Sequence, residues 1–415
     1  MTKRCIPFFV FSATLFLAAA LALHSNELQQ KRAPMEQITL FIASDLHYLS
    51  PELTDHGVFF QELIQNADGK VMEYCEEITD AFIQQVTAQK PDALILSGDL
   101  TFNGAKLSHT TLAEKLLEIE NAGIPVLALP GNHDLENPSA AAFRGNGYTL
   151  TDSISAQQFA EIYGGFGFDD AISRDSASLS YAVQLKPGLR VLMLDVNTAD
   201  SPGALKAETL QWAERQLRDA ARQGIHMLAV SHQNLLQHNS LFSYGFVMKN
   251  NAPLLALYEK YEVICNLSGH MHIQHIAQSE NGLTEIAASA LIVSPNQYGV
   301  LTLEGISAEY HTEPIPVPLL ENADFPSYAH TFLWETAYRQ AAADLSGDLP
   351  DAGAMARFFA DINTAYVSGR MDTVIWEEAV FQNWKDRSAL MYAYLQSLFN
   401  DGFQNHTETT FSIER

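Results

Sequence analysis

The chain has 415 residues, 47% of them hydrophobic, which is enough for one large domain with a single core and a smaller appendage. Lysine and arginine total 24 against 49 aspartates and glutamates, and the resulting net charge of −25 repels polynucleotide backbones and anionic membrane surfaces. This composition excludes a disordered chain and a long nucleic acid as partner. A small anionic ligand stays compatible with it wherever bound cations dominate the local potential.

The N-terminal segment has the layout of an export signal. Lys3 and Arg4 precede an apolar run from Ile6 to Leu23, and a polar stretch from His24 to Arg32 follows. The apolar run is also about long enough to remain as a membrane anchor. We therefore expect residues 1–32 to form a signal peptide or an N-terminal anchor. The protein would be exported, secreted or attached to the cell envelope, and would contact the membrane only through this segment if it is not cleaved.

Short β-rich apolar runs then alternate with helical patterns. In chain order we expect a strand at Thr39 to Ala43, a helix near Met72 to Gln89, a strand at Ala93 to Ser97, a helix near Leu112 to Ala122 and a strand at Pro125 to Leu129. This alternation predicts a βαβαβ unit, in which the strands are parallel.

The next part of the chain predicts a second set of strands. We expect them at Ser180 to Leu185, Arg190 to Asp195, His226 to Ser231 and Val263 to Leu267, with an amphipathic helix at Lys206 to Arg222. Alternating segments from Ile273 to about Thr312 are typical of an antiparallel meander. Parallel units followed by hairpins predict an α/β fold with two packed sheets, which we assign to residues 33–313.

The composition changes after a proline-rich stretch. Pro314, Pro316 and Pro318 cannot continue a helix or a central strand, so residues 314–320 are expected to form a linker. Residues 321–415 show helical spacing at 327–343, 354–368 and 388–399, which predicts a small helical C-terminal domain. Its many aromatic residues are expected to pack it against the main domain.

Five clusters of ligand-type residues each stand where a predicted strand ends. They are Ser44-Asp45-Leu46-His47, Ser97-Gly98-Asp99, Pro130-Gly131-Asn132-His133-Asp134, Ser231-His232 and Ser268-Gly269-His270-Met271-His272. The carboxyl ends of parallel strands meet in one crevice, so the five clusters can converge. Taken alone, Asp99 and Asn132 could be turn residues and His232 a hydrogen-bonded histidine at a strand end. Their joint occurrence in this order favours a metal site.

The clusters offer carboxylate oxygens, an amide oxygen and imidazole nitrogens as ligands, and no thiolate. Imidazoles suit zinc and iron, and carboxylate and amide oxygens extend the range to manganese. We therefore expect two divalent ions, Mn, Fe or Zn. Asp99 is the expected bridge because it stands in the sequence between the two groups of terminal ligands, and a carboxylate that uses both oxygens can join two cations.

The pattern Asp45-x-His47, Gly98-Asp99, Gly131-Asn132-His133-Asp134, His232 and Gly269-His270-x-His272 resembles the calcineurin-like metallophosphoesterase family. The resemblance implies a four-layer α-β-β-α sandwich. It also implies one metal on Asp45, His47, Asp99 and His272, a second on Asp99, Asn132, His232 and His270, and a bridging water or hydroxide. By the same resemblance His133 faces the substrate as a catalytic residue, and Asp134 holds its ring; a helix cap is the other role open to Asp134.

Finer features resemble a branch of exported cyclic-nucleotide phosphodiesterase-like proteins with a helical C-terminal extension. They are Gly98-Asp99-Leu100-Thr101 with Asn103-Gly104, Ser178-Leu179-Ser180-Tyr181, and Gly203 before the helix of Trp212. The chain departs from the branch in having one histidine, not two, at Ser231-His232-Gln233. Asn103 and His238 are either substrate contacts or polar residues that stabilise loops.

The function expected from this resemblance is hydrolysis of a small phosphodiester, with a cyclic nucleotide as one candidate. The alternatives are a phosphomonoesterase or nucleotidase, a lipid-headgroup phosphodiesterase, and a binding protein that kept the fold without catalysis. The oligomeric state is not set by the sequence.

Overall fold

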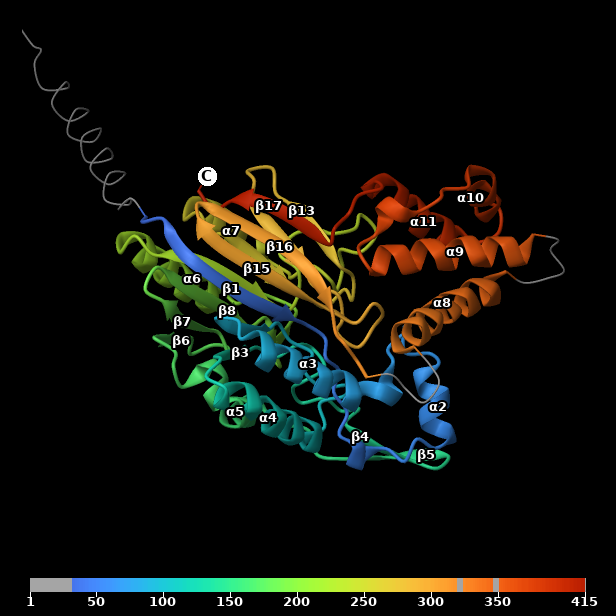
Figure 1. The fold of residues 1–415 in the computed structure, drawn as a ribbon, viewed down its shortest axis with the longest axis horizontal. Helices are drawn as coiled ribbons and strands as arrows, with labels where there is room; N and C mark the ends of the chain where they lie inside the picture. Colours follow the sequence, from blue (N-terminus) through green and yellow to red (C-terminus); the bar gives the residue numbers. More distant parts are fainter. Residues whose placement is uncertain (1–31, 319–323, 346–350, 415) are drawn as a thin grey trace, which may run out of the picture.

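The computed structural model describes residues 32–318, 324–345 and 351–414, so the expected signal peptide or anchor, except for its last residue Arg32, lies outside the described residues. Within those ranges, no helix combines the length and the apolar character that crossing a bilayer requires. The described chain forms two mixed β-sheets that pack face to face, with helices on their outer faces and a group of helices at one end (Figure 1).

The first sheet has six strands in the order β17-β16-β15-β1-β2-β3. Their bounds are β17 Glu408–Ser412, β16 Ser307–Pro314, β15 Gln297–Gly305, β1 Met35–Ala43, β2 Ala93–Leu96 and β3 Val126–Ala128. β1, β2 and β3 are parallel and are joined by α3 (Cys75–Gln89) and α4 (Lys106–Asn121), as the sequence predicts. The other three strands run antiparallel to their neighbours.

The second sheet has seven strands in the order β13-β14-β12-β11-β8-β7-β6. Their bounds are β13 His275–Gln278, β14 Thr284–Ala287, β12 Cys265–Ser268, β11 His226–Ser231, β8 Leu189–Leu194, β7 Tyr181–Lys186 and β6 Ser173–Arg174. The four central strands β14, β12, β11 and β8 are parallel. The predicted meander is therefore divided between the sheets, since β13 and β14 belong to this one and β15 and β16 to the other.

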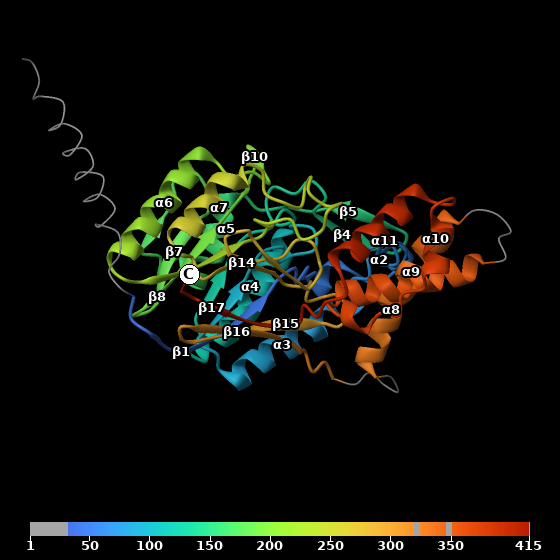
Figure 2. The ribbon, with the colours of Figure 1, turned by 90° about the horizontal axis from the view of Figure 1, so that it is seen from above.

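Alternating side chains of the second sheet pack on opposite sides of it. Val191 and Met193 of β8 join the core between the sheets, whereas Leu192 and Leu194 pack under α6 (Ala207–Arg222) and α7 (Asn251–Lys260). This two-residue period places one helical layer on the second sheet, while α3 and α4 cover the first. Figure 2 shows these layers from above. The four-layer α/β sandwich expected from the sequence is confirmed.

Smaller elements surround the strand ends. α2 spans Val58–Ile64, α5 spans Ala156–Ile162, and the chain forms a hairpin of β4 (Ala141–Arg144) with β5 (Gly147–Leu150). A second short ribbon joins β9 (Asn197–Thr198) to β10 (Ser201–Pro202). α2 and the β4–β5 hairpin lie together at the lower right of Figure 1.

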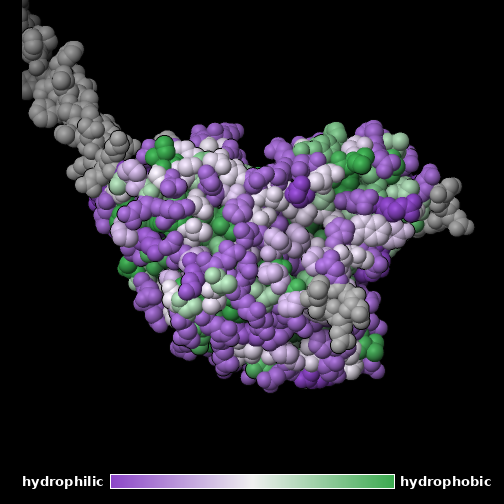
Figure 3. All heavy atoms as spheres, in the orientation of Figure 1, coloured by the Kyte–Doolittle hydropathy of each residue, from purple (hydrophilic) through white to green (hydrophobic). Residues whose placement is uncertain are grey.

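The C-terminal part forms a helical lobe and then returns to the sandwich. The helices are α8 Phe325–Asp344, α9 Ala352–Val367, α10 Glu378–Trp384 and α11 Ala389–Asp401, and they share a core of their own. In Figure 3 this lobe is set off from the sandwich by a notch. After α11 the chain adds β17 to the edge of the first sheet, a strand that the helical pattern of the sequence did not predict.

Polar contacts tie the lobe to the sandwich. His275 Nε2 of β13 lies 2.7 Å from Asp401 Oδ2 of α11, and Asn239 Nδ2 donates to Tyr366 Oη and Ser397 Oγ at 3.1 Å each. Ile273, next to the candidate ligand His272, is part of the core of the lobe. The C-terminal helices therefore pack on the end of the sandwich where the expected ligands lie.

Candidate metal centre

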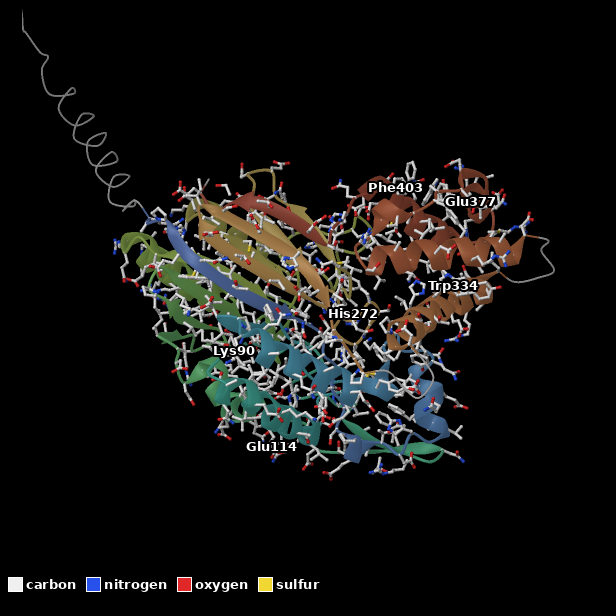
Figure 4. The ribbon with its side chains drawn as sticks, in the orientation of Figure 1. Lys90, Glu114, His272, Trp334, Glu377 and Phe403 are labelled. Atoms are coloured by element: carbon white, nitrogen blue, oxygen red, sulfur yellow. The ribbon has the colours of Figure 1, made fainter. Side chains whose placement is uncertain are left out.

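All seven expected ligands lie in loops that follow parallel strands. Asp45 and His47 follow β1, Asp99 follows β2, Asn132 follows β3, His232 follows β11, and His270 and His272 follow β12. The pairing of β1 with β2 continues into these loops, because the backbone N–H of Asp45 donates to Gly98 O and that of His47 to Asp99 O, both at 3.0 Å. His272, labelled in Figure 4, lies where the strands end and the helical lobe begins.

Asp45, His47, Asp99 and His272 form a first group, in which one ligand atom from each lies within 4.8 Å of the others. His272 Nε2 is 3.0 Å from His47 Nε2 and 3.2 Å from Asp45 Oδ1. His47 Nε2 is 3.8 Å from Asp45 Oδ1 and 4.0 Å from Asp99 Oδ2. One divalent ion with ligand bonds of about 2.0–2.2 Å fits among donors at this spacing.

Asp99, His232 and His270 form a second group. His232 Nε2 is 3.4 Å from Asp99 Oδ2 and 3.1 Å from Asn132 Oδ1, so the amide oxygen of Asn132 joins this group. His270 Nε2 lies 2.8 Å from the carbonyl oxygen of Gly245, which makes Nε2 a hydrogen-bond donor and leaves the lone pair on Nδ1 for an ion. The structure thus brings all seven residues together as two groups that share Asp99.

A single oxygen of Asp99 faces both groups. Asp99 Oδ2 is the atom nearest to His47 and His232, whereas Oδ1 accepts the backbone N–H of His133 at 2.8 Å. From the sequence, Asp99 was expected to join two cations with both carboxylate oxygens. The structure corrects this, because one oxygen is held by the loop after β3 and only the other stands between the groups.

The backbone of the ligand loops is strained. Five of the seven residues have a positive φ: 54° at Asp45, 44° at His47, 47° at Asp99, 68° at His270 and 55° at His272. Non-glycine residues in this region cost of order 1–3 kcal/mol each, and such strain gathers at functional sites. Without these φ values the side chains would leave their strands in other directions and would not converge.

Two glycines of the motifs allow the loops to approach closely. A Cβ atom on Gly131 would lie 2.1 Å from Asp99 Oδ1, and one on Gly269 would lie 1.7 Å from Ser44 Oγ and 2.5 Å from Asp45 Oδ2. Any side chain at these positions would displace a candidate ligand. The Gly131-Asn132 and Gly269-His270 motifs therefore contain glycine because there is no room for a side chain at these two positions.

The charges of the centre fit divalent cations. Burial raises the pKa of Asp45 and Asp99, but the neighbouring histidines outweigh burial and hold both carboxyls well below their usual range. Burial lowers the pKa of His232, but the carboxylates of Asp99, Asp45 and Asp134 together raise it by more, to about 9. His232 Nδ1 is 3.0 Å from Ser97 O while Nε2 faces two oxygens, so a positive species belongs at Nε2, either a proton or a metal ion. Asp45 Oδ1 is buried and accepts no hydrogen bond, so its lone pairs remain available to a metal ion.

Metal loading should therefore release protons. Below about pH 9 the metal-free protein keeps a proton on His232, and this proton must leave before Nε2 can bind an ion. We expect at least one proton to be released per chain at pH 7, and metal affinity and activity to fall by about tenfold or more per pH unit on acidification. Calorimetry in buffers of different ionisation enthalpy measures the released protons. Metals and activity that both stay constant from pH 8 to pH 5 would contradict a cage rich in histidine.

His133 lies beside the two groups and is open to solvent. Its Nε2 is 3.9 Å from Asp99 Oδ2, and 40% of its side chain is exposed, in contrast to the buried His47 and His232. Its Nδ1 is 3.0 Å from the carbonyl oxygen of Phe102, so Nδ1 carries a proton and donates it. Nε2 is then the nitrogen that can exchange a proton with a bound molecule.

The expected role of Asp134 is wrong. Asp134 was expected to hold the His133 ring or to cap a helix, but Phe102 O holds the ring. The buried Asp134 carboxylate instead accepts hydrogen bonds from the backbone N–H groups of Leu100, Thr101 and Gly131 and from the hydroxyl of Thr101. A carboxylate satisfies several N–H donors more strongly than a neutral acceptor does. Asp134 therefore positions the loops after β2 and β3.

Asn103 and His238 have different surroundings. Asn103 donates to Ala141 O at 3.2 Å and lines a cavity with Asn132 and His133, so it is close to the candidate centre. His238 is buried, with Nδ1 3.0 Å from His275 Nδ1 and Nε2 3.4 Å from Glu285 Oε2. His238 thus belongs to the junction with the helical lobe.

A buried lysine near the centre was missed by the sequence analysis. Lys70 is 7% exposed, and within the described ranges its ammonium forms no hydrogen bond or ion pair. Burial lowers the pKa of Lys70, and the charges of Asp68, Asp45 and Asp99 act against burial. No strand-end motif marks this residue, so nothing in the sequence indicated it. A positive charge on Lys70 would therefore act on the carboxylates of the candidate centre.

A third group of His275, Asp401 and His406 also has metal-like spacing. Here His406 Nδ1 accepts the backbone N–H of Ile276 at 3.2 Å, so the neutral ring carries its proton on Nε2 and offers no free lone pair. We assign this group to the polar junction between lobe and sandwich.

Comparisons with known proteins agree with the motif pattern. The sequence profile described as "Calcineurin-like phosphoesterase" matches residues 38–274. A "Probable cyclic nucleotide phosphodiesterase" from Ruthia magnifica subsp. Calyptogena magnifica is 26% identical over 182 residues, which cover 44% of this chain and 62% of that protein. A "Probable glycerophosphodiester phosphodiesterase GpdQ" from Arcobacter nitrofigilis is 28% identical over 189 residues, covering 44% of this chain and 57% of that protein. The match thus spans less than two thirds of the length of these curated relatives.

Among solved structures, a dimetal phosphatase from Danio rerio is similar at a TM-score of 0.48 and 13% identity, covering 67% of this chain and 96% of that one. A purple acid phosphatase from yellow lupin (Lupinus luteus) is similar at a TM-score of 0.45 and 14% identity, covering 70% of this chain and 54% of that one. The family profile extends over more than half of the 415 residues, from β1 to the loop after β12 that carries His270 and His272. The chain belongs to the calcineurin-like phosphoesterase family.

Proposed function

We propose that the protein is a dinuclear metal-dependent phosphodiesterase that acts on a small phosphodiester. The observation that carries the proposal is a pair of cavities that border the candidate metal centre and share no lining residue. One cavity, of about 480 Å³, touches His270 and His272, and the other, of about 630 Å³, touches Asn132 and His133. A phosphodiester has two ester groups to accommodate, whereas a monoester has one. The names of both curated relatives also favour a diester.

The first cavity is here called the helix-side cavity, since α8, α9 and α11 supply part of its wall. The second is called the hairpin-side cavity, since Ala141, Phe143, Tyr148 and Leu150 of the β4–β5 hairpin line it. Both volumes lie within the range of about 300–1,000 Å³ that is usual for small-molecule sites.

The proposed ligands are Asp45, His47, Asp99 and His272 for one ion and Asp99, Asn132, His232 and His270 for the other. Two such ions, when bound, supply a water of lowered pKa and positive charge at the phosphoryl oxygens. The metal identity, Mn, Fe or Zn, stays part of the proposal.

His133 is proposed to protonate the leaving group. During hydrolysis a hydroxide oxygen forms a bond to phosphorus while the bond from phosphorus to the leaving oxygen breaks with its electron pair. His133 in its imidazolium form gives the proton of Nε2 to that oxygen, and Phe102 O keeps hold of Nδ1. The products are an alcohol and a phosphomonoester. Because His133 lines the hairpin-side cavity, the leaving alcohol would occupy that cavity.

Lys70 is proposed to hold a phosphoryl oxygen. We expect Lys70→Met to raise KM about 10- to 100-fold at unchanged metal content, since a hydrogen bond to a charged group contributes about 1.5–3 kcal/mol. Steady-state kinetics with metal analysis measures both quantities. Lys90→Met is the matched control, because Lys90 is exposed and lies away from His272 in Figure 4. Unchanged KM and kcat in Lys70→Met would remove this residue from the site.

A substrate screen with metal analysis tests the proposed function. The purified, metal-loaded chain is assayed with 4-nitrophenyl phosphate, methyl 4-nitrophenyl phosphate, bis(4-nitrophenyl) phosphate, cyclic nucleotides and glycerophosphodiesters. We expect about two ions per chain and a higher kcat/KM for diesters than for monoesters. Preference for monoesters would support a phosphomonoesterase or nucleotidase, preference for glycerophosphodiesters a lipid-headgroup enzyme, and two bound ions without turnover a binding protein.

A further inference from the structure

The helix-side cavity differs from the hairpin-side cavity in what it can accept. Given the proposed function, we propose that the helix-side cavity binds the ester group that stays on phosphorus, and that it selects an uncharged aromatic group. Three observations carry this proposal: the place of His133, the rings that line the cavity, and the absence of cationic side chains from its lining.

The place of His133 orients the substrate. His133 and Asn132 line the hairpin-side cavity, whereas His270 and His272 line the helix-side cavity. An acid that protonates the leaving oxygen must be within hydrogen-bond reach of that oxygen. The leaving group therefore takes the side of His133, and the group that remains on phosphorus takes the side of the helical lobe.

A continuous wall of aromatic rings runs from the metal centre into the helix-side cavity. Phe246 lies 5.6 Å from the ring of His270, and Phe242 lies 5.2 Å from Phe246 and 5.9 Å from Tyr394 of α11. Tyr394 in turn lies 5.6 Å from Phe359 of α9, measured between ring centroids. Aromatic pairs in such geometry attract each other beyond the effect of burial alone, so an aromatic ligand can extend the series.

The lining of the helix-side cavity does not suit a second anionic group. Its described residues include no lysine or arginine, and the one carboxylate among them is Asp68. The polar ends of Tyr394 and Asn363 bond to each other, with the Tyr394 hydroxyl 2.7 Å from Asn363 Oδ1. A phosphate or carboxylate on the retained group would thus find no cationic side chain in this lining and would meet the negative charge of Asp68. An uncharged aromatic group needs no ionic partner in the helix-side cavity.

The residues of this wall come from distant parts of the chain. Phe242 and Phe246 belong to the loop after β11, and Phe359 and Tyr394 belong to the C-terminal helices. The helical lobe therefore has a role in selecting the substrate as well as in packing.

The test varies the retained group at a constant leaving group. The metal-loaded full chain hydrolyses 4-nitrophenyl phosphates whose second ester group is methyl, phenyl or choline, and release of 4-nitrophenolate is measured. In the wild type we expect kcat/KM for the phenyl ester to exceed that for the methyl ester by about 10- to 100-fold. The choline ester is the arm that tests a cationic lipid headgroup, because aromatic rings also attract quaternary ammonium ions.

Two neighbouring phenylalanines of α9 supply matched variants. Phe359 lines the cavity, whereas Phe358 is equally buried, at 4% exposure each, but packs on Trp376 at 5.2 Å. Phe359→Leu should lower the phenyl-to-methyl ratio by about 2- to 10-fold, and Phe358→Leu should leave it unchanged. Because each ratio is compared between variants, the different chemical reactivity of the two esters cancels.

A second readout does not depend on turnover. Calorimetry should show phenylphosphonate binding more tightly than methylphosphonate to the metal-loaded wild type, with the preference lost in Phe359→Leu and kept in Phe358→Leu. Absent diester hydrolysis with this binding pattern intact would defeat the proposed function and leave the cavity assignment standing. Three results would overturn the inference. The first is equal binding and equal kcat/KM for the phenyl and methyl groups, and the second is a preference for the choline ester. The third is a change in leaving-group selectivity in Phe359→Leu when the retained group is always methyl.

Discussion

Replacing His133 with alanine should lower kcat by about two to four decades, as expected when a general acid or an electrostatic partner of the transition state is removed. The metal content should stay at the wild-type level, because the side chain of His133 belongs to neither ligand group. The backbone N–H that Asp99 Oδ1 accepts is kept in the alanine variant. Single-turnover rates and metal analysis on the same preparation measure the two effects.

Substrates with different leaving groups test the role of His133 more directly. A good leaving group needs little protonation, so His133→Ala should lose less activity with 4-nitrophenyl esters than with alkyl esters. His311→Ala is the control, since His311 is a half-exposed histidine of β16 and belongs to neither ligand group. Loss of metal from His133→Ala with full turnover at the remaining sites would show that His133 is a ligand and not the acid.

Asp99→Asn should weaken both ions together, by more than about 100-fold each, a loss beyond what outer residues of metal sites contribute. Asp99 is the one residue shared by both groups, and its Oδ2 faces His47 on one side and His232 on the other. The asparagine keeps the shape and the acceptor for the His133 N–H but removes the negative charge between the two ions. Equilibrium dialysis followed by metal analysis gives both affinities.

Two comparison variants make the result specific. His47→Ala removes a ligand of one group alone and should weaken mainly one ion. Asp195 is another buried carboxylate that follows a parallel strand, but it accepts the backbone N–H groups of Leu179 and Asn197. Asp195→Asn should therefore keep both ions. A stoichiometry near two at normal affinity in Asp99→Asn would rule out Asp99 as the bridge.

The order of strands and helices along the chain could be predicted because it depends on local sequence patterns. Alternating apolar runs and helical spacing located β1, α3, β2, α4 and β3, and both sheets were expected. Local patterns were less informative where polar residues face inward. α4 begins at Lys106, earlier than predicted, since Ser108 and His109 are buried and bond to Ser50, Thr101 and Tyr163.

The candidate ligands could be named from the sequence because each one follows a strand and stands in a short motif. Parallel strands end at one edge, so strand order and motif together place Asp45, Asp99 and His270 in one crevice. Distances, hydrogen-bond partners and free volume depend on segments that meet only after folding. That is why Asp134 was given a wrong role, and why Lys70 was missed: Asp134 bonds to Leu100 of another loop, and Lys70 feels the charges of Asp45 and Asp99 only in the folded chain.

The sequence by itself determined the fold class, the family and the set of residues offered as ligands, because strand ends and motifs are local. The tertiary structure alone decided that one oxygen of Asp99 stands between the two groups, that Phe102 O fixes the His133 ring, and that β17 closes the edge of the first sheet. The tertiary structure also formed the helix-side cavity, in whose wall Phe242 contacts Tyr394 from a distant part of the chain. Such contacts follow from packing, and no pattern within one segment encodes them.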